Sequence, residues 1–169
     1  MIMLTLQPAV PIVSPIKINI ITTSLDVLVA VGSQSAKPHS KAEKLEGGSW
    51  SDIEEAPVGG YFAHYAVIFD AGNFYYFGGY NGGVLNTIFR LSGETWTWSN
   101  AGRLNSARSS HGAALVEDTF MVIGGYSGNK PNEACLLNNG QFTCEVKPSS
   151  LTNYYYNIIF NVSDDYGLC

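Results

Sequence analysis

Charged residues are scarce in this 169-residue chain: they make up 14% of it, with 9 basic against 14 acidic side chains. No basic cluster stands out, so nucleic acid is not an expected partner. No apolar run reaches the ~18 residues of a membrane-spanning helix, because Pro8, Pro11 and Pro15 interrupt the apolar N-terminus. This N-terminus also lacks the basic start of a secretory signal. Residues 1–15 are therefore expected to form an irregular lead-in, and no membrane span is predicted.

Patterns that carry catalysis or bind metals are also missing. His39, His64 and His111 are scattered, whereas a metal site needs ligands clustered at short spacing. The glycine-rich "GGYNGG" at 78–83 precedes a predicted strand, and a phosphate-binding loop requires a helix at that point. No G-x-S-x-G nucleophile motif occurs. The sequence therefore predicts neither a cofactor nor an enzyme.

What the chain does contain is a repeat of 46 residues. Its landmarks are a glycine pair after an apolar run, degenerate in the first copy, and a large aromatic residue about 17 positions later. In the three copies these are Gly32 (after Val31), Gly78-Gly79 and Gly124-Gly125 for the glycines, and Trp50, Trp96 and Phe142 for the aromatic residues. Independent landmarks that share one period indicate a repeated structural unit.

Each copy has the pattern of four short strands. In the middle copy the strands are expected over residues 62–69, 73–77, 86–91 and 95–101, separated by the turn sequences "DAGN", "GGYNGGVL" and "SGET". Short strands with regular turn signals indicate an all-β repeat. Four strands in about 45–50 residues is the size of one β-propeller blade.

The last turn of the third copy contains Asn139-Gly140, a signal for a two-residue type I′ hairpin. This turn places Leu137 opposite Phe142 and Cys135 opposite Cys144. The same register in the other copies pairs a leucine or phenylalanine with an aromatic residue, and core packing is expected for these pairs. The pairs are Leu91 with Trp96 and Phe89 with Trp98 in the middle copy, and Leu45 with Trp50 in the first.

The Cys135–Cys144 pair falls on a non-hydrogen-bonded position of the hairpin, where side chains approach closely enough for a disulfide. The alternative is two reduced, buried thiols in a cytosolic protein. A bridge would indicate an oxidising compartment, in agreement with the glycosylation sequon at Asn161 but not with the missing signal peptide. It would also leave Cys169 without a partner in this chain. The localisation stays open, and an extracellular one is suspected.

The glycine pair followed by tryptophan resembles the kelch repeat, over about residues 16–169. The resemblance implies an all-β, incomplete kelch-type β-propeller of about three four-stranded antiparallel blades plus the start of a fourth. The expected units are a degenerate blade at 16–57, blades at 58–104 and 105–148, and a truncated blade at 149–169. We therefore expect a fragment whose unpaired blade edges favour self-association. The cysteine hairpin followed by "YYYNIIFNVSDDY" is also similar to secreted invertebrate kelch-like proteins.

In kelch propellers the loops between the second and third strands share one face with the connections between blades. The resemblance therefore implies a protein-binding surface formed by Tyr80, Asn81, Arg103, Arg108, Tyr126 and Lys130. Tyrosine and arginine are enriched among residues that dominate protein interfaces. Each of the six could equally be a solvated loop residue, and Arg108 could instead bond between blades.

Three other functions remain open. A sialidase-type propeller enzyme is one, since "FRLSGETW" keeps Gly93, Thr95 and Trp96 of its turn motif but has Phe89 and Leu91 where serine and aspartate belong. A galactose oxidase-type enzyme is the second, although Cys144 and residues 154–156 supply only the residue types. The third is a BTB-kelch ubiquitin-ligase adaptor, which requires a helical region before the repeats. Fold analogy does not decide between them.

Overall fold

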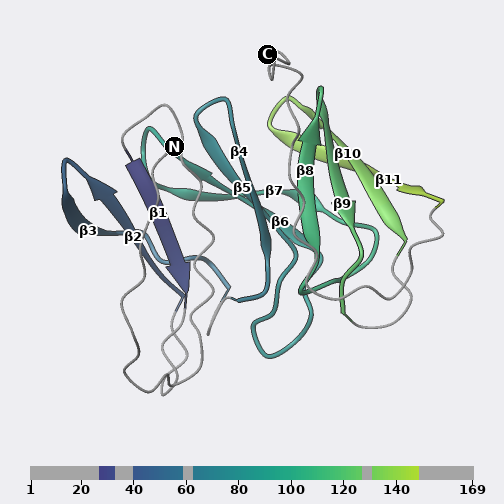
Figure 1. Cartoon of the computed structure of the whole chain (residues 1–169), viewed down its shortest axis with the longest axis horizontal. Helices are drawn as coiled ribbons and strands as arrows, with labels where there is room; N and C mark the ends of the chain where they lie inside the picture. Colours follow the sequence, from purple (N-terminus) through teal and green to yellow (C-terminus); the bar gives the residue numbers. More distant parts are fainter. Residues whose placement is uncertain (1–26, 33–39, 59–62, 127–130, 149–169) are drawn as a thin grey trace, which may run out of the picture.

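The structure is a computed structural model that describes residues 27–32, 40–58, 63–126 and 131–148. These residues form strands and turns and contain no helix, so the predicted all-β class is confirmed. The strands, labelled in Figure 1, are β1 (Val27–Gly32), β2 (Lys41–Glu46), β3 (Ser49–Ile53), β4 (Ala66–Asp70), β5 (Asn73–Phe77), β6 (Thr87–Ser92), β7 (Trp98–Arg103), β8 (Gly112–Val116), β9 (Thr119–Ile123), β10 (Asn132–Asn138) and β11 (Gln141–Lys147).

Two sheets account for all of these strands. One has the order β1-β2-β3, and the other has the order β4-β5-β6-β7-β11-β10-β9-β8. The larger sheet consists of two antiparallel meanders, β4–β7 and β8–β11, which join where β7 and β11 run parallel at Gly102 and Phe142. The end strands β4 and β8 also lie close together. The eight-stranded sheet is thus nearly closed into a barrel.

The 46-residue period also appears in the backbone conformation. β8 and β9 begin 46 residues after β4 and β5. Just before each first strand, His64 (φ 55°) and Ser110 (φ 51°) have left-handed conformations, and so do Ala71 (φ 44°) and Glu117 (φ 54°) in the following turns. Because side chains rarely adopt positive φ without a specific constraint, the two meanders repeat the same turns as well as the same strands.

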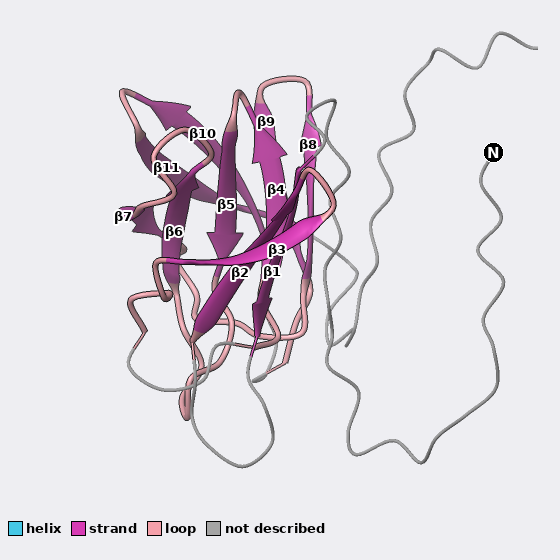
Figure 2. Cartoon of the chain, turned by 90° about the vertical axis from the view of Figure 1, so that its left-hand side faces the viewer, coloured by secondary structure: helices cyan, strands magenta, loops and turns pink. Residues whose placement is uncertain are grey.

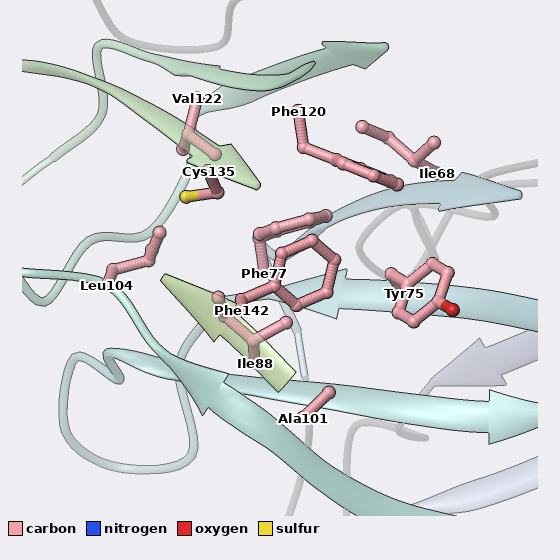
Figure 3. Packing of buried hydrophobic residues seen from close by; sticks show 10 residues of the cluster. All are labelled: Ile68, Tyr75, Phe77, Ile88, Ala101, Leu104, Phe120, Val122, Cys135 and Phe142. Atoms are coloured by element: carbon pink, nitrogen blue, oxygen red, sulfur yellow. The ribbon is translucent and has the colours of Figure 1, made fainter. Parts of the chain in front are cut away.

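The interior of the barrel is formed by one face of each meander (Figure 3). The buried side chains are Ile68, Tyr75, Phe77, Ile88, Ala101 and Leu104 from the β4–β7 part of the chain and Phe120, Val122, Cys135 and Phe142 from the β8–β11 part. Four of their rings, those of Tyr75, Phe77, Phe120 and Phe142, have centroids 4.9–5.9 Å apart in five pairs. Burying each large apolar side chain contributes about 1.5–3 kcal/mol.

The opposite face of β4–β7 packs against the β1–β3 sheet. β4–β7 is therefore the middle of three layers, which lie from left to right in Figure 1, and β1–β3 faces the viewer in Figure 2. Phe74 and Tyr76 of β5 point to this side, whereas Tyr75 and Phe77 point into the barrel. Successive side chains of a strand face opposite sides of the sheet, and here both sides are covered. This explains why the run "FYYF" is apolar throughout instead of alternating with polar residues.

Polar contacts also join the β1–β3 sheet to β4–β7. The indole Nε1 of Trp98 donates a hydrogen bond to the Glu54 carbonyl oxygen at 2.7 Å. The Trp98 backbone amide donates a second one, at 2.9 Å, to the Glu54 carboxylate. The ammonium group of Lys44 lies 4.7 Å from the centre of a ring of Trp96, a cation–π contact. The tryptophans of the middle repeat therefore anchor the neighbouring layer.

Two of the three predicted hairpin registers are confirmed. Leu137 pairs with Phe142 and Cys135 with Cys144 across the Asn139-Gly140 turn, and the two cysteines form a disulfide with their Cα atoms 4.0 Å apart. Leu45 pairs with Trp50 as expected. The prediction of core packing holds for Phe142, which is 7% exposed, but not for Trp50, which is 50% exposed.

The register predicted for the middle hairpin is wrong. Leu91 pairs with Trp98 instead of Trp96, and Phe89 pairs with Asn100 instead of Trp98. Residues 93–97 form a longer turn here, in which the Trp96 amide donates to the Ser92 carbonyl oxygen at 2.9 Å. Trp96 itself has a left-handed φ of 57°. This turn is longer than the two-residue turn of the third repeat, so shifting the pairing of the third repeat by 46 residues gives the wrong register here.

Candidate interaction surface at the loop end

The connector between β7 and β8, residues 104–111, lies between the loop after β5 and the loop after β9. Its Arg108 amide donates to the Leu85 carbonyl oxygen, and its Arg108 carbonyl oxygen accepts from the Gly79 amide, both at 2.9 Å. On the other side, the Tyr126 amide donates to the Ser109 carbonyl oxygen at 2.7 Å. The connector and the two loops thus form one backbone-bonded region, which we call the loop end.

Glycines make this close approach possible. At Gly78 (φ 57°), an added Cβ would lie 2.6 Å from the Arg108 carbonyl oxygen and 3.0 Å from the His111 ring. At Gly125 (φ 118°), it would lie 3.0 Å from the Ser109 carbonyl oxygen. A residue with a side chain would have both a strained backbone and a steric clash at these positions. The glycine pairs therefore have a structural role at the loop end.

Tyr80 and Asn81 occupy the loop that follows the first of these pairs. Tyr80 is half-buried, and its backbone pairs with Ala63 through hydrogen bonds of 2.8 and 3.1 Å. The Asn81 side-chain amide donates to the Val58 carbonyl oxygen at 2.7 Å, which ties the loop to the segment before β4. Asn81 therefore holds the loop in place in addition to lining the surface.

Among the described residues of the predicted set, Tyr126 and Arg103 are exposed. Tyr126 is 56% exposed, directly after Gly124-Gly125, and Arg103 is exposed at the end of β7. Lys130 and Asn161 lie outside the described residues. The structure thus brings Tyr80, Asn81 and Tyr126 to the loop end on a hydrogen-bonded frame.

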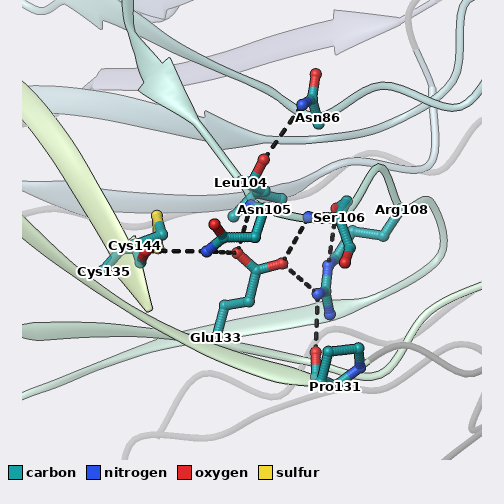
Figure 4. Close-up of a disulfide and its surroundings, with 9 residues drawn as sticks. All are labelled: Asn86, Leu104, Asn105, Ser106, Arg108, Pro131, Glu133, Cys135 and Cys144. Carbon is teal, nitrogen blue, oxygen red and sulfur yellow. Dashed lines mark hydrogen bonds and ion pairs between the residues drawn. A yellow bond between two sulfur atoms is a disulfide. The ribbon is translucent and has the colours of Figure 1, made fainter. Parts of the chain in front are cut away.

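Arg108, by contrast, is buried. Its side chain and that of Glu133 are both 0% exposed and form an ion pair at 2.5 Å (Figure 4). The guanidinium also donates to the carbonyl oxygens of Gly124 at 2.9 Å and Pro131 at 2.8 Å. Arg108 is therefore not part of the surface. Its side chain does not make the bond between blades considered as its alternative role either, because Glu133, Gly124 and Pro131 all belong to the same predicted blade, 105–148, as Arg108.

Glu133 is the residue around which this network is organised. One carboxylate oxygen accepts from Arg108 and from the Ser106 amide at 3.0 Å, and the other accepts from the Asn105 amide at 2.7 Å. The Asn105 side chain donates both to Glu133 and, at 2.9 Å, to the Cys144 carbonyl oxygen (Figure 4). A buried ion pair is tolerated only when its remaining donors and acceptors are satisfied, as they are here. The network fixes the connector onto β10 and the disulfide hairpin.

Glu133 and Asn105 are not among the site residues predicted from the sequence. The available signal was the charge of Glu133 in the otherwise apolar strand "NEACLL". Burial lowers the pKa of Arg108, and the neighbouring Glu133 carboxylate partly offsets this effect. Because both side chains are shielded from water, the Arg108–Glu133 pair is not a charged site open to a ligand.

His111 is the second buried titratable group of the region. It is 5% exposed, and within the described part of the chain neither of its ring nitrogens has a hydrogen-bond partner. Burial, together with the nearby Arg108 charge and against a smaller opposing effect of the Phe77 backbone, lowers the pKa of His111 to about 3. His111 is therefore neutral at physiological pH and packs beside Gly78 and Gly125.

No protein-family model and no curated protein sequence matches this chain. Among the described residues, no three histidine, cysteine or acidic side chains come together as a metal site. The same residues include no helix of the length and apolarity needed to cross a membrane. The loop end presents aromatic and polar side chains, among them Tyr80, Asn81 and Tyr126, beside the hydrogen-bonded connector.

Proposed function

We propose that this chain is part of a kelch-type β-propeller and binds another protein through its loop end. The meanders β4–β7 and β8–β11 correspond to blades in this proposal. Support for the propeller comes from the 46-residue period, the antiparallel four-stranded meanders and their face-to-face packing. A propeller stacks such four-stranded sheets around an axis.

The exposure of Tyr126 is the observation on which the binding function rests. A tyrosine that is 56% exposed stands on a loop whose backbone is bonded to the connector. Tyrosines dominate many interfaces because they bury a large area and lose little conformational freedom. Because the Tyr126 backbone is already bonded to Ser109 of the connector, binding through this residue avoids part of the entropy lost on ordering. Tyr80, on the equivalent loop of the middle repeat, extends the same surface.

A binding assay with matched variants tests the proposal. A partner is first isolated from the native source with the wild-type chain, and its affinity is then measured by calorimetry. Tyr126→Ala and Tyr80→Ala are each expected to raise the dissociation constant about tenfold or more, with unchanged circular dichroism. Asp118→Ala is the control, since Asp118 is exposed in the turn between β8 and β9, at the end of these strands away from the loop end.

Two results would contradict the assignment. If the tyrosine variants unfold, these side chains are core residues and not contact residues. If they fold and bind as tightly as the Asp118→Ala control, the partner uses another surface.

A further inference from the structure

The repeat predicts which side chains meet between successive layers. Tyr75 and Ile88 point from β4–β7 into the barrel, toward β8–β11. Their counterparts 46 residues later are Met121 and Ala134, which pair with each other on adjacent strands. Because their chain neighbours Phe120 and Cys135 face the barrel interior, Met121 and Ala134 lie on the opposite side of β8–β11. This side corresponds to a face that is covered in the middle repeat.

Exposed apolar residues are found on that side. Leu136 is 49% exposed and Val116 is 55% exposed, and both alternate with side chains that pack into the barrel. We call Val116, Met121 and Leu136 the outer face of β8–β11. Isolated exposed apolar residues are ordinary, but a group of them on one sheet face indicates a contact surface.

The β1–β3 sheet has the complementary feature. Leu45 and Trp50 pair with each other and are the counterparts, two periods earlier, of Leu137 and Phe142. Phe142 is buried in the barrel. In β1–β3, Ala42 and Ile53 face the middle layer, so Leu45 and Trp50 point away from it. We call Leu45 and Trp50 the outer face of β1–β3, and Trp50 is half exposed there.

These two outer faces are thus equivalent to the two faces that pack together inside the barrel. We propose that the outer face of β1–β3 in one copy of the chain docks on the outer face of β8–β11 in a second copy. The contact continues the layer-on-layer packing already present between β4–β7 and β8–β11. It joins two different surfaces, so it is head-to-tail and either closes a ring or extends a chain of copies. It uses neither Tyr80 nor Tyr126 and is independent of the proposed partner binding, but it rests on the stacking of repeated layers that the propeller proposal also assumes.

Sedimentation velocity of the full 169-residue chain over a range of concentrations tests this contact. The wild type is expected to show reversible, concentration-dependent association. Trp50→Asp and Leu136→Asp, each placing a charge on one outer face, are each expected to weaken association at least about tenfold. Val146→Asp is the control, because Val146 is 50% exposed but shares its side of β11 with Phe142 and Cys144, which face the barrel. Circular dichroism verifies that every variant folds.

Mixing the two variants separates head-to-tail docking from other kinds of association. Trp50→Asp keeps an intact β8–β11 outer face, and Leu136→Asp keeps an intact β1–β3 outer face. An equimolar mixture should therefore form a 1:1 complex, although each variant alone is monomeric. A monomeric wild type, variants that associate like the control, or a mixture that stays monomeric would each overturn the proposal.

Discussion

Replacing Gly78 by alanine tests the close approach on which the loop end depends. The φ of 57° costs an ordinary residue about 1–2 kcal/mol. The new Cβ would also lie 2.6 Å from the Arg108 carbonyl oxygen, and forcing a packed segment to move costs about 1–3 kcal/mol more. The free energy of unfolding should therefore fall by about 2–5 kcal/mol, a large part of the ~5–15 kcal/mol typical of a domain.

Gly47 offers a matched control for this substitution. Its φ is also 57°, but no atom lies within 4 Å of the position that a Cβ would occupy. Gly47→Ala should therefore lose only the backbone contribution of about 1–2 kcal/mol. Urea unfolding followed by tryptophan fluorescence measures both variants, with the slope of the transition checked for constancy. Equal losses at the two glycines would show that the connector does not lie against Gly78, and the account of the loop end would fail.

Three further predictions concern buried groups. Glu133→Gln should lower the free energy of unfolding by about 3–5 kcal/mol, because it leaves the Arg108 charge buried without its counter-ion. Urea unfolding measures this loss, and a value below about 1 kcal/mol would contradict the buried pair. His111 has a folded pKa of about 3 against about 6.5 when unfolded, so stability is complete above pH 6.5 and decreases on acidification toward pH 3, by an amount on the order of 5 kcal/mol. His111→Phe should flatten that acid dependence, and an unchanged pH profile would exclude His111 as its source. The partners of the Cys135–Cys144 disulfide are 9 residues apart, and its reduction should lower the free energy of unfolding by about 2–3 kcal/mol. Thermal unfolding is measured with and without reductant, and equal midpoints would show that the bond is absent in solution.

Local turn chemistry explains which parts of the fold could be predicted from the sequence. Asn139 and Gly140 have φ values of 50° and 77°, as a type I′ turn requires. Two residues therefore determine the pairing of the whole β10–β11 hairpin, including the position of the disulfide. The structural role of the glycine pairs could also be predicted, because they recur every 46 residues at positions where the backbone needs glycine.

Contacts between distant segments explain what could not be predicted. The turn after β6 is held by a hydrogen bond from the Gly93 amide to the Gly72 carbonyl oxygen at 3.0 Å. This contact joins residues 21 positions apart, so the local sequence does not predict it. The longer turn places Trp98 opposite Leu91. Arg108 looked like a loop residue because its partner, Glu133, lies 25 positions away. Burial of such a pair depends on tertiary packing, and single-residue patterns carry little information about it.

The junction between β7 and β11 has a consequence for how such chains change in length. Among the described residues, strand pairing between the two meanders is limited to Gly102 and Phe142, and the connector adds a few backbone bonds, such as those of Arg108 with Leu85 and Gly79. Each meander otherwise pairs its strands internally. Duplicating or deleting a 46-residue segment would therefore break few hydrogen bonds and would present the same kind of apolar face to the next layer. Genetic gain or loss of whole segments is the change that this architecture tolerates best, whereas an insertion of a few residues within a strand would shift the register and turn buried side chains outward.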